Sequence, residues 1–231
     1  MKSNVRVSAA LLALSLACAV MALMTTPAAA AVVSLGGGWQ ASWDPSWDAM
    51  VHLQTVSLDG DVLIISKTAE FTQPPVNGIF PPIPITFMQI SDVAAKYIVI
   101  ENEAILNDTG VDWTDFHIDL LGGNAVFDSG LTARSGGPDP IGWDIAPFAK
   151  AAFTATLKRL DIWDGVVQAG QVWWPGGGPT GGQLWLQVFP DSEVHALFTL
   201  KEAPTPEPAT LCLLALGSAS LLIRRGRRVA G

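Results

Sequence analysis

The chain has 231 residues with 13 basic and 21 acidic side chains, which gives a formal net charge of −8. This acidic balance argues against nucleic acid or anionic lipid as a partner, because both are bound through clustered lysine and arginine. The two cysteines, Cys18 and Cys212, lie in terminal segments that we expect to be removed. The mature protein is therefore predicted to contain neither a disulfide nor a catalytic thiol.

The first thirty residues have the order of parts of a secretion signal. Lys2 and Arg6 precede an apolar stretch over residues 9–23, and a run of small residues follows. We expect the secretion translocon and signal peptidase to process this segment. The residues of the predicted cleavage site are Ala28, Ala30 and Ala31. A membrane-spanning first helix is the weaker alternative, because the apolar stretch is shorter than the ~20 residues that a span needs.

Residues 31–203 are predicted to form one domain, since this length suits one hydrophobic core better than two. Residues 31–208 contain all twenty-one acidic residues and seven basic residues, which gives this region a formal charge of −14. Apolar runs rich in β-branched and aromatic residues recur about every ten residues between turn-forming residues, which indicates antiparallel β-structure. The predicted strands are 50–57, 62–67, 83–90, 96–102, 114–121, 125–128, 152–159, 171–174, 183–189 and 194–200. We predict an all-β, two-sheet antiparallel β-sandwich, immunoglobulin-like or jelly-roll-like, flanked by an N-terminal signal helix and a C-terminal apolar helix.

Turn-forming residues mark two of the strand connections. Asp59-Gly60-Asp61 predicts a hairpin, and residues 107–110, Asn-Asp-Thr-Gly, predict a turn that ends on a glycine with positive φ. The one helical indication is a turn or two within residues 144–151. The glycine-rich segments 135–138 and 175–179 are predicted to be loops.

The C-terminal 28 residues have three parts in a fixed order. Residues 204–208 read PTPEP, residues 209–223 are apolar, and four arginines follow. Fifteen helical residues span roughly 22 Å, less than the ~30 Å hydrocarbon core, so we expect a marginal transmembrane helix held by its basic flank. The basic residues are Arg224, Arg225, Arg227 and Arg228.

Pro206-Glu207-Pro208, the apolar segment and the arginine cluster together resemble the PEP-CTERM sorting signal of bacteria. The resemblance implies that an exosortase, a membrane-embedded cysteine transpeptidase, cuts near the Pro-Glu-Pro element. The protein would be anchored briefly in the inner membrane and then passed to the cell surface or extracellular matrix. The alternative is an ordinary C-terminal membrane anchor. Residues 97–120 also resemble a strand-turn-strand unit of immunoglobulin-like PEP-CTERM proteins, to which we attach no activity.

Polar residues alternate along the predicted strand 114–121. Asp115, His117 and Asp119 share one face, with Asp112 just before the strand, while the intervening apolar residues face the core. Carboxylates and an imidazole in such a row are candidate metal ligands, although a solvated strand face explains them equally well. Calcium is the candidate ion at the loop aspartates, which are otherwise solvated turn residues; no other cofactor is predicted. These aspartates are Asp44, Asp48, Asp59, Asp61, Asp108 and Asp112.

Nine tryptophans are an unusual number for a domain of this size. Trp43, Trp47 and Trp174 are candidates for stacking on a sugar ring, and aspartates beside the first two could accept hydroxyl hydrogen bonds. The alternative is that most tryptophans pack in the core. Because Trp173 and Trp174 are adjacent on a predicted strand, one should face the core and the other the solvent.

The sequence contains no nucleophile elbow or phosphate-binding glycine loop, so we predict that the protein is not an enzyme. The leading interpretation is a non-enzymatic surface or matrix protein with a structural or adhesive role, as in a biofilm. The second is a carbohydrate-binding module that recognises extracellular polysaccharide through exposed tryptophans, with calcium as the candidate ion. The third is a secreted glycoside hydrolase, which would need two facing carboxyl groups about 5 to 9.5 Å apart.

Overall fold

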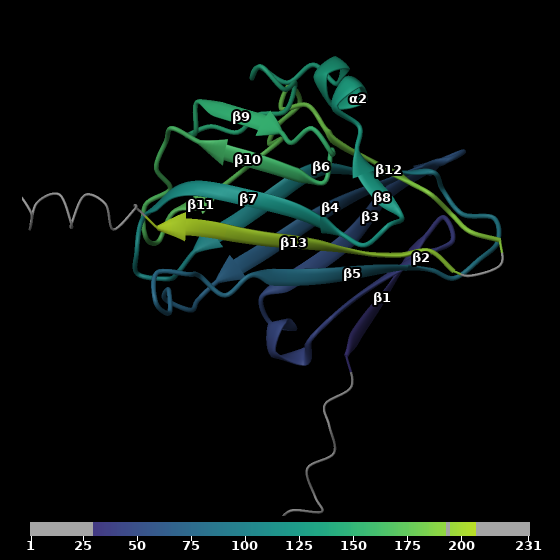
Figure 1. The fold of residues 1–231 in the computed structure, drawn as a ribbon, viewed down its shortest axis with the longest axis horizontal. Helices are drawn as coiled ribbons and strands as arrows, with labels where there is room; N and C mark the ends of the chain where they lie inside the picture. Colours follow the sequence, from purple (N-terminus) through teal and green to yellow (C-terminus); the bar gives the residue numbers. More distant parts are fainter. Residues whose placement is uncertain (1–29, 193–194, 207–231) are drawn as a thin grey trace, which may run out of the picture. The chain divides into compact units, whose positions relative to one another are not determined.

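The computed structural model describes residues 30–192 and 195–206 (Figure 1). The predicted signal peptide and the predicted apolar helix 209–223 lie outside these ranges. Among the described residues, no helix is both long enough and apolar enough to span a membrane.

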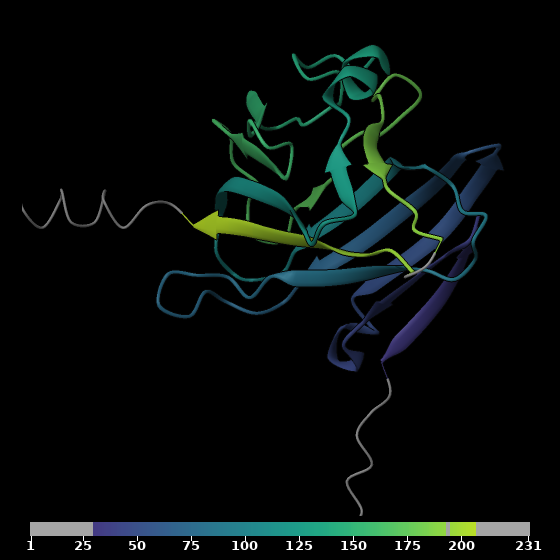
Figure 2. The ribbon, with the colours of Figure 1, turned by 45° about the vertical axis from the view of Figure 1, so that its right-hand side comes forward.

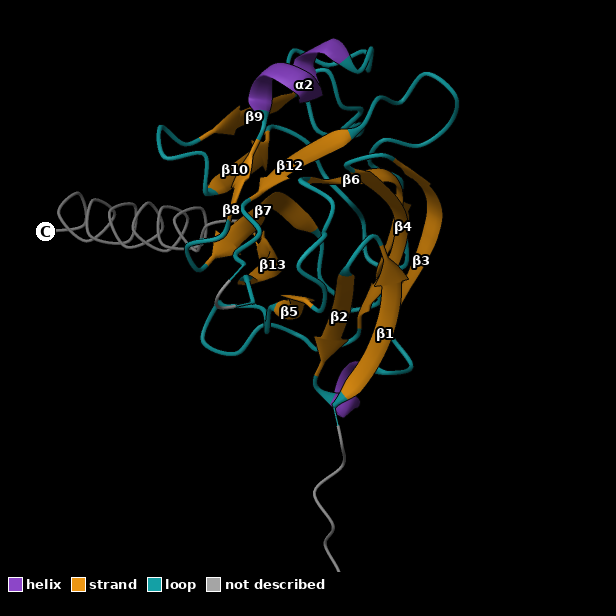
Figure 3. Ribbon diagram, turned by 90° about the vertical axis from the view of Figure 1, so that its right-hand side faces the viewer, coloured by secondary structure: helices purple, strands orange, loops and turns teal. Residues whose placement is uncertain are grey.

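The domain consists of two β-sheets that face each other across one hydrophobic core (Figures 2 and 3). The larger sheet has the order β1 (Ala31–Gly36), β2 (Trp39–Trp43), β5 (Ile83–Gln89), β13 (Leu197–Pro206), β7 (Trp113–Leu121), β10 (Arg159–Trp163) and β9 (Lys150–Phe153). The smaller sheet has the order β3 (Val51–Asp59), β4 (Val62–Phe71), β6 (Tyr97–Asn107), β12 (Leu184–Val188) and β8 (Ala125–Phe127), and β11 (Val172–Trp173) also pairs with β6. The all-β, two-sheet prediction is confirmed. The smaller sheet is mixed, however, because β4 and β6 run parallel.

Both predicted turns are confirmed. Gly60 connects β3 to β4 with a φ of 55°, and Gly110 lies between β6 and β7 with a φ of 74°. The side chain of Asn107 stabilises the second turn, since its Nδ2 donates to the carbonyl oxygens of Val111 at 2.9 Å and Val167 at 3.0 Å. Turn chemistry is a local property, which is why the sequence predicts it well.

Two strands at the start of the domain were not predicted. β1 and β2 form a hairpin whose connection includes Gly37 and Gly38, both with positive φ. β1 reads AVVSLG and β2 reads WQASW, so neither strand contains more than three consecutive apolar residues. The short 3₁₀ helix η1 (Pro45–Trp47) follows β2.

Other predicted elements also differ from the structure. β4 and β6 extend four and five residues beyond their predicted ends at 67 and 102. The predicted strand 152–159 is wrong, because residues 154–158 form the turn between β9 and β10, with Leu157 at a φ of 54°. The predicted helical turn within 144–151 is also wrong; the α-helix found within residues 30–192 and 195–206 is α2 (Ser129–Arg134), and the Asp128 carboxylate accepts a hydrogen bond from the Leu131 amide at 2.8 Å. The last strand extends to Pro206, three residues beyond the predicted end of the domain.

Aromatic side chains from both sheets fill the core. Phe71 of β4 meets Trp113 of β7 edge to face at 5.3 Å, and Phe116 meets Trp173 at 4.9 Å. The alternation predicted for β7 is confirmed, because Phe116, Ile118 and Leu120 are buried while the polar residues between them lie on the outer face. This interlocked core forms without a cysteine in the described part of the chain.

Candidate functional site

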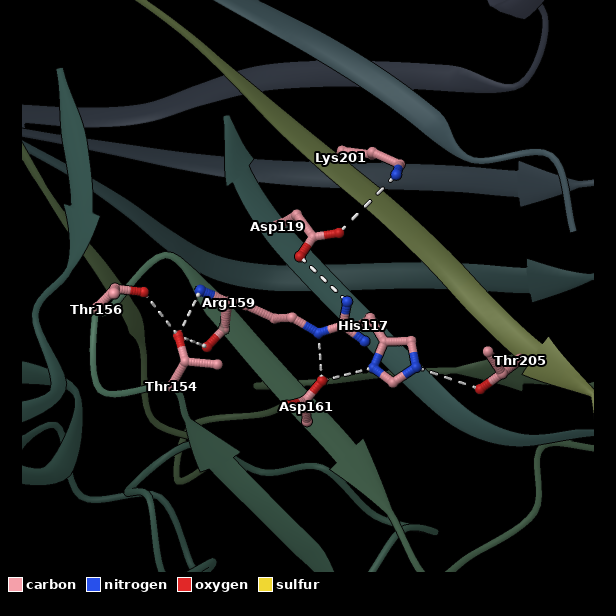
Figure 4. Close-up of polar contacts among 8 residues, drawn as sticks. All are labelled: His117, Asp119, Thr154, Thr156, Arg159, Asp161, Lys201 and Thr205. Carbon is pink, nitrogen blue, oxygen red and sulfur yellow. Dashed lines mark hydrogen bonds and ion pairs between the residues drawn. The ribbon is translucent and has the colours of Figure 1, made fainter. Parts of the chain in front are cut away.

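A polar network covers part of the outer face of the larger sheet (Figure 4). His117 Nδ1 lies 2.8 Å from Asp161 Oδ1, which also accepts a hydrogen bond from Arg159 Nε at 2.5 Å. Arg159 reaches Asp119 at 3.6 Å, and Lys201 lies 4.0 Å from the other oxygen of Asp119. Charges of opposite sign thus alternate across β13, β7 and β10, an arrangement typical of a fixed, solvated sheet surface.

The candidate metal ligands are distributed over this surface. His117 and Asp119 share the outer face of β7 as predicted, but their partners include the cations Arg159 and Lys201 rather than further ligands. Asp112 instead accepts a hydrogen bond from the Ala169 amide at 2.8 Å, and Asp115 lies opposite Thr205 in the sheet register. No group of three or more His, Cys, Asp or Glu residues suited to a metal ion occurs in residues 30–192 and 195–206.

Three of the loop aspartates considered for calcium already have structural partners, and Asp112, described above, is one of them. Asp44 caps η1 by accepting a hydrogen bond from the Ser46 amide at 2.8 Å. Hydrogen bonding to the Ser46 side chain, and secondly to its amide, lowers the pKa of the Asp44 carboxyl group. Asp61 forms an ion pair with Lys96 at 2.7 Å. Calcium binding stays a prediction.

The three candidate tryptophans differ in exposure. Trp43 and Trp47 are 7% and 8% exposed, so the prediction that they present flat rings to a sugar needs correction. Trp43 occupies an inward position of β2, and η1 brings Trp47 back against the core. Trp174 is 60% exposed while its neighbour Trp173 is 1% exposed, which confirms that the pair faces opposite sides.

Trp174 stands between two surface hollows. One, of about 480 Å³, is also lined by Asp144 and Gln171, and the other by His52 and Glu70. A third hollow meets the first at Gly178 and is lined by further polar residues. Those residues are Glu101, Asn102, Ser135 and Gln183. Because neighbouring hollows share lining residues, the three adjoin one another, and we call this row of hollows the path; it contains the Trp174 ring and hydrogen-bonding groups in each hollow.

The two glycine-rich segments around residues 135–144 and 175–182 support this path. The amide of Asp144 donates to the Gly181 carbonyl at 2.7 Å, and Gly137 donates to Gly142 at 2.9 Å. A Cβ atom at Gly182 would lie 2.1 Å from the Gly142 carbonyl oxygen, so the backbones are too close for any side chain there. The glycines therefore allow the two loops to pack against each other beside Trp174.

The core also contains an ionic cluster that the sequence pattern did not predict. Lys67 of β4, Glu103 of β6 and Glu202 of β13 have fully buried side chains. Lys67 Nζ contacts Glu103 Oε1 and donates a hydrogen bond to Glu202 Oε2 at 2.5 Å. Burial, together with the adjacent Glu202 carboxylate, raises the pKa of Glu103 to about 8.

An irregularity in β6 creates this cluster. Ile65 of β4 pairs with Ile100 of β6, but the next residue, Ser66, pairs with Asn102, so Glu101 is skipped. Strict alternation from Ile100 would place Glu103 on the outer face, and the extra residue turns it inward opposite Lys67. One signal was available in the sequence: Lys67 follows Leu63 and Ile65 on the inward phase of β4.

Comparison with known protein families confirms the resemblance of the C-terminal segment to a sorting signal. The described residues define an acidic all-β domain whose last strand runs into the sequence PTPEP. Residues 204–228 match the family described as the PEP-CTERM protein-sorting motif. The chain therefore carries a PEP-CTERM motif, which implies export, sorting to the cell surface and an exosortase as processing partner. No curated protein and no solved structure matches the chain.

Proposed function

We propose that this protein is an exosortase-sorted component of the cell surface or extracellular matrix, with a non-enzymatic structural or adhesive role such as in a biofilm. The observation that carries the proposal is the continuity of the sorting motif with the folded domain. The motif begins at residue 204, and its first residues belong to β13, where Pro204 pairs with Phe116. The sorting motif thus overlaps the last three residues of the sandwich.

The positions of both domain ends support a two-step route. β1 begins at Ala31, directly after the predicted signal peptide, and β13 ends at Pro206, beside the Pro-Glu-Pro element. Signal peptidase and exosortase would therefore cut outside every strand. Transient anchoring of residues 209–223 in the inner membrane would separate the two cuts.

A structural role is further supported by the polar face of the larger sheet. Asp119 and Asp161 are engaged by Arg159, and Asp161 also by His117, so these acids hold neighbouring strands together. Side chains fixed in such pairs are better suited to stabilising a solvated sheet surface than to acid–base catalysis.

The test is the intact mass and the cellular fraction of the protein in hosts with and without the exosortase. We expect a species lacking residues 1–30 and the segment beyond about Pro208, outside the inner membrane, only when the exosortase is present. A chain with Glu207→Ala and Pro208→Ala should keep its tail in both hosts. A wild-type tail that persists regardless of the exosortase would contradict the proposal.

The path along Trp174 supports a second candidate function, binding of extracellular polysaccharide. An exposed indole offers a flat apolar face to a sugar ring, and Asp144 and Glu70 provide hydroxyl acceptors on its two sides. The charge of −14 in residues 31–208 favours a neutral polysaccharide over an acidic one.

Calorimetric titration with neutral polysaccharides from the host matrix would test this binding. Trp174→Ala should abolish it, whereas Ile79→Ala should not, because Ile79 is 70% exposed but lines none of the three hollows. Equal binding by both variants would exclude the path. Release of shorter sugar chains in the same assay would instead support the third proposal, a glycoside hydrolase.

A further inference from the structure

The buried cluster combines one amine with two carboxyl groups. Lys67 Nζ contacts a carboxyl oxygen of both Glu103 and Glu202, and all three side chains are fully buried. If both acids were ionised, the cluster would carry one uncompensated negative charge in the core, which is strongly unfavourable. One ammonium group therefore faces two carboxyl groups, and the buried environment favours a proton on one of the two acids.

Their surroundings assign the two acids different states. Desolvation and the nearby Glu202 carboxylate raise the pKa of Glu103 to about 8, so Glu103 is a neutral carboxylic acid at neutral pH. Burial lowers the pKa of Lys67, but the two glutamates outweigh this effect and the net direction is upward. The amine is thus protonated at rest and donates to Glu202 at 2.5 Å. A protonated carboxyl group can be attacked by an amine, whereas a carboxylate resists attack.

We propose that Lys67 and Glu103 join in an intramolecular isopeptide bond, with Glu202 as the proton carrier. The two partners lie opposite each other in the parallel pair β4–β6, which holds the amine against the carboxyl group. Because the fold already holds the two groups together, the reaction does not require the loss of entropy that bringing them together would cost. The fully buried site limits the access of water, which would favour the reverse hydrolysis.

The reaction balances within the cluster. Lys67 passes one proton to Glu202, and the lone pair of the neutral amine forms a C–N bond with Cδ of Glu103. Glu202 returns this proton to the Glu103 hydroxyl group, which leaves as water when the C–O bond breaks. Glu202 then accepts the remaining surplus proton of the nitrogen and ends as a neutral acid. An ammonium, a carboxylate and a carboxylic acid become an amide, a carboxylic acid and one water molecule.

The product removes every formal charge from the cluster. A buried ion pair is stabilised by its mutual attraction but loses its hydration, whereas an amide and a neutral acid have no such desolvation cost. The bond would also tie β4 to β6 covalently in a domain whose described residues contain no cysteine. This cross-link would restrict the unfolded chain in the way that a disulfide does.

The test is the intact mass of the processed chain from its host, measured under denaturing conditions, followed by a tryptic map. We expect a mass lower than that of the processed sequence by one water molecule. Trypsin should not cut after Lys67, and the peptide that ends at Lys96 should stay attached to peptide 97–134. Tandem mass spectrometry should place the link between Lys67 and Glu103.

Two variants separate the bond from the fold. Lys67→Met should keep its full mass. Glu202→Gln should remain folded by circular dichroism but lose the water at least tenfold more slowly, which a merely structural role of Glu202 would not cause. A full-mass wild-type chain that trypsin cuts after Lys67 would overturn the proposal, even if Lys67→Met failed to fold. A link to Glu202 instead of Glu103 would overturn the assigned roles.

Discussion

Lys67 and Glu103 lie opposite each other in the core because β6 contains one more residue than β4 beyond the paired isoleucines Ile65 and Ile100. A one-residue irregularity therefore changes which side chain enters the core. It places a carboxyl group against an amine where neither can be hydrated. The chemistry of this cluster depends on strand register as much as on residue type.

The rate of bond formation should fall as the pH rises above about 8. Only the protonated form of Glu103 reacts, and its pKa of about 8 means that the reactive fraction decreases about tenfold per pH unit beyond that value. Chain translated in vitro, kept in urea and then refolded at pH 6 to 10 can be followed by intact mass. A rate that increases steadily to pH 10 would indicate that deprotonation of Lys67 is limiting and would contradict this assignment.

The pH dependence of stability should also differ between the linked and unlinked chains. In an unlinked chain Glu103 holds a proton when folded that it releases when unfolded, over the window from the ordinary glutamate pKa of 4.5 to about 8. The free energy of unfolding would then fall as the pH rises through this window, by up to about 1.4 kcal/mol per pH unit. The linked chain cannot titrate at Glu103. Urea unfolding of both forms at pH 5, 6.5 and 8 would show the steeper decline in the unlinked form, and equal slopes would contradict the expectation.

Alanine substitution of the two adjacent tryptophans should have different effects. Trp173 is buried against Phe116 and Phe148, and its indole donates to the Ile145 carbonyl at 3.2 Å. Trp173→Ala should reduce the free energy of unfolding by about 3–5 kcal/mol, whereas Trp174→Ala should change it by less than about 1 kcal/mol. Urea denaturation monitored by circular dichroism would measure both changes. Similar losses would mean that Trp174 also supports the core.

Two glycines with similar backbone angles should tolerate alanine differently. Gly182 has a φ of 75° and no room for a Cβ atom, while Gly178 has a φ of 79° and open space around it. Gly178→Ala should cost about 1 kcal/mol from backbone strain alone. Gly182→Ala should cost at least ~2 kcal/mol more, because the two glycine-rich loops must separate. Thermal unfolding of the two variants would measure the difference in stability. Equal midpoints would show that the two loops can move apart at little cost.

The end of β13 should be needed for full stability. Pro204 is buried and pairs with Phe116, so the strand continues beyond the domain end predicted at residue 203. A chain that ends at Ala203 should be less stable than one that ends at Pro206 by roughly 1–2 kcal/mol, the usual value for burying a side chain of this size. Urea unfolding of the two truncated chains would compare them directly. Identical unfolding midpoints would show that residues 204–206 do not contribute to the stability of the domain.

The sequence by itself determined the features that depend on neighbouring residues. The all-β class, the turns at Gly60 and Gly110, the two faces of β7 and the opposite orientations of Trp173 and Trp174 follow from alternation and turn chemistry. The PEP-CTERM motif is likewise a linear pattern that needs no fold to be recognised.

The tertiary structure decided the features that depend on residues far apart in the chain. Trp43 and Trp47 are buried because they belong to the core that both sheets share, and the first hollow beside Trp174 lies where residues 144–147 meet residues 171–178. The cluster of Lys67, Glu103 and Glu202 needs a skipped residue in β6 and the opposing sheet. Alternation gives the phase of one strand, but register between strands and packing between sheets are set by contacts that no local pattern contains.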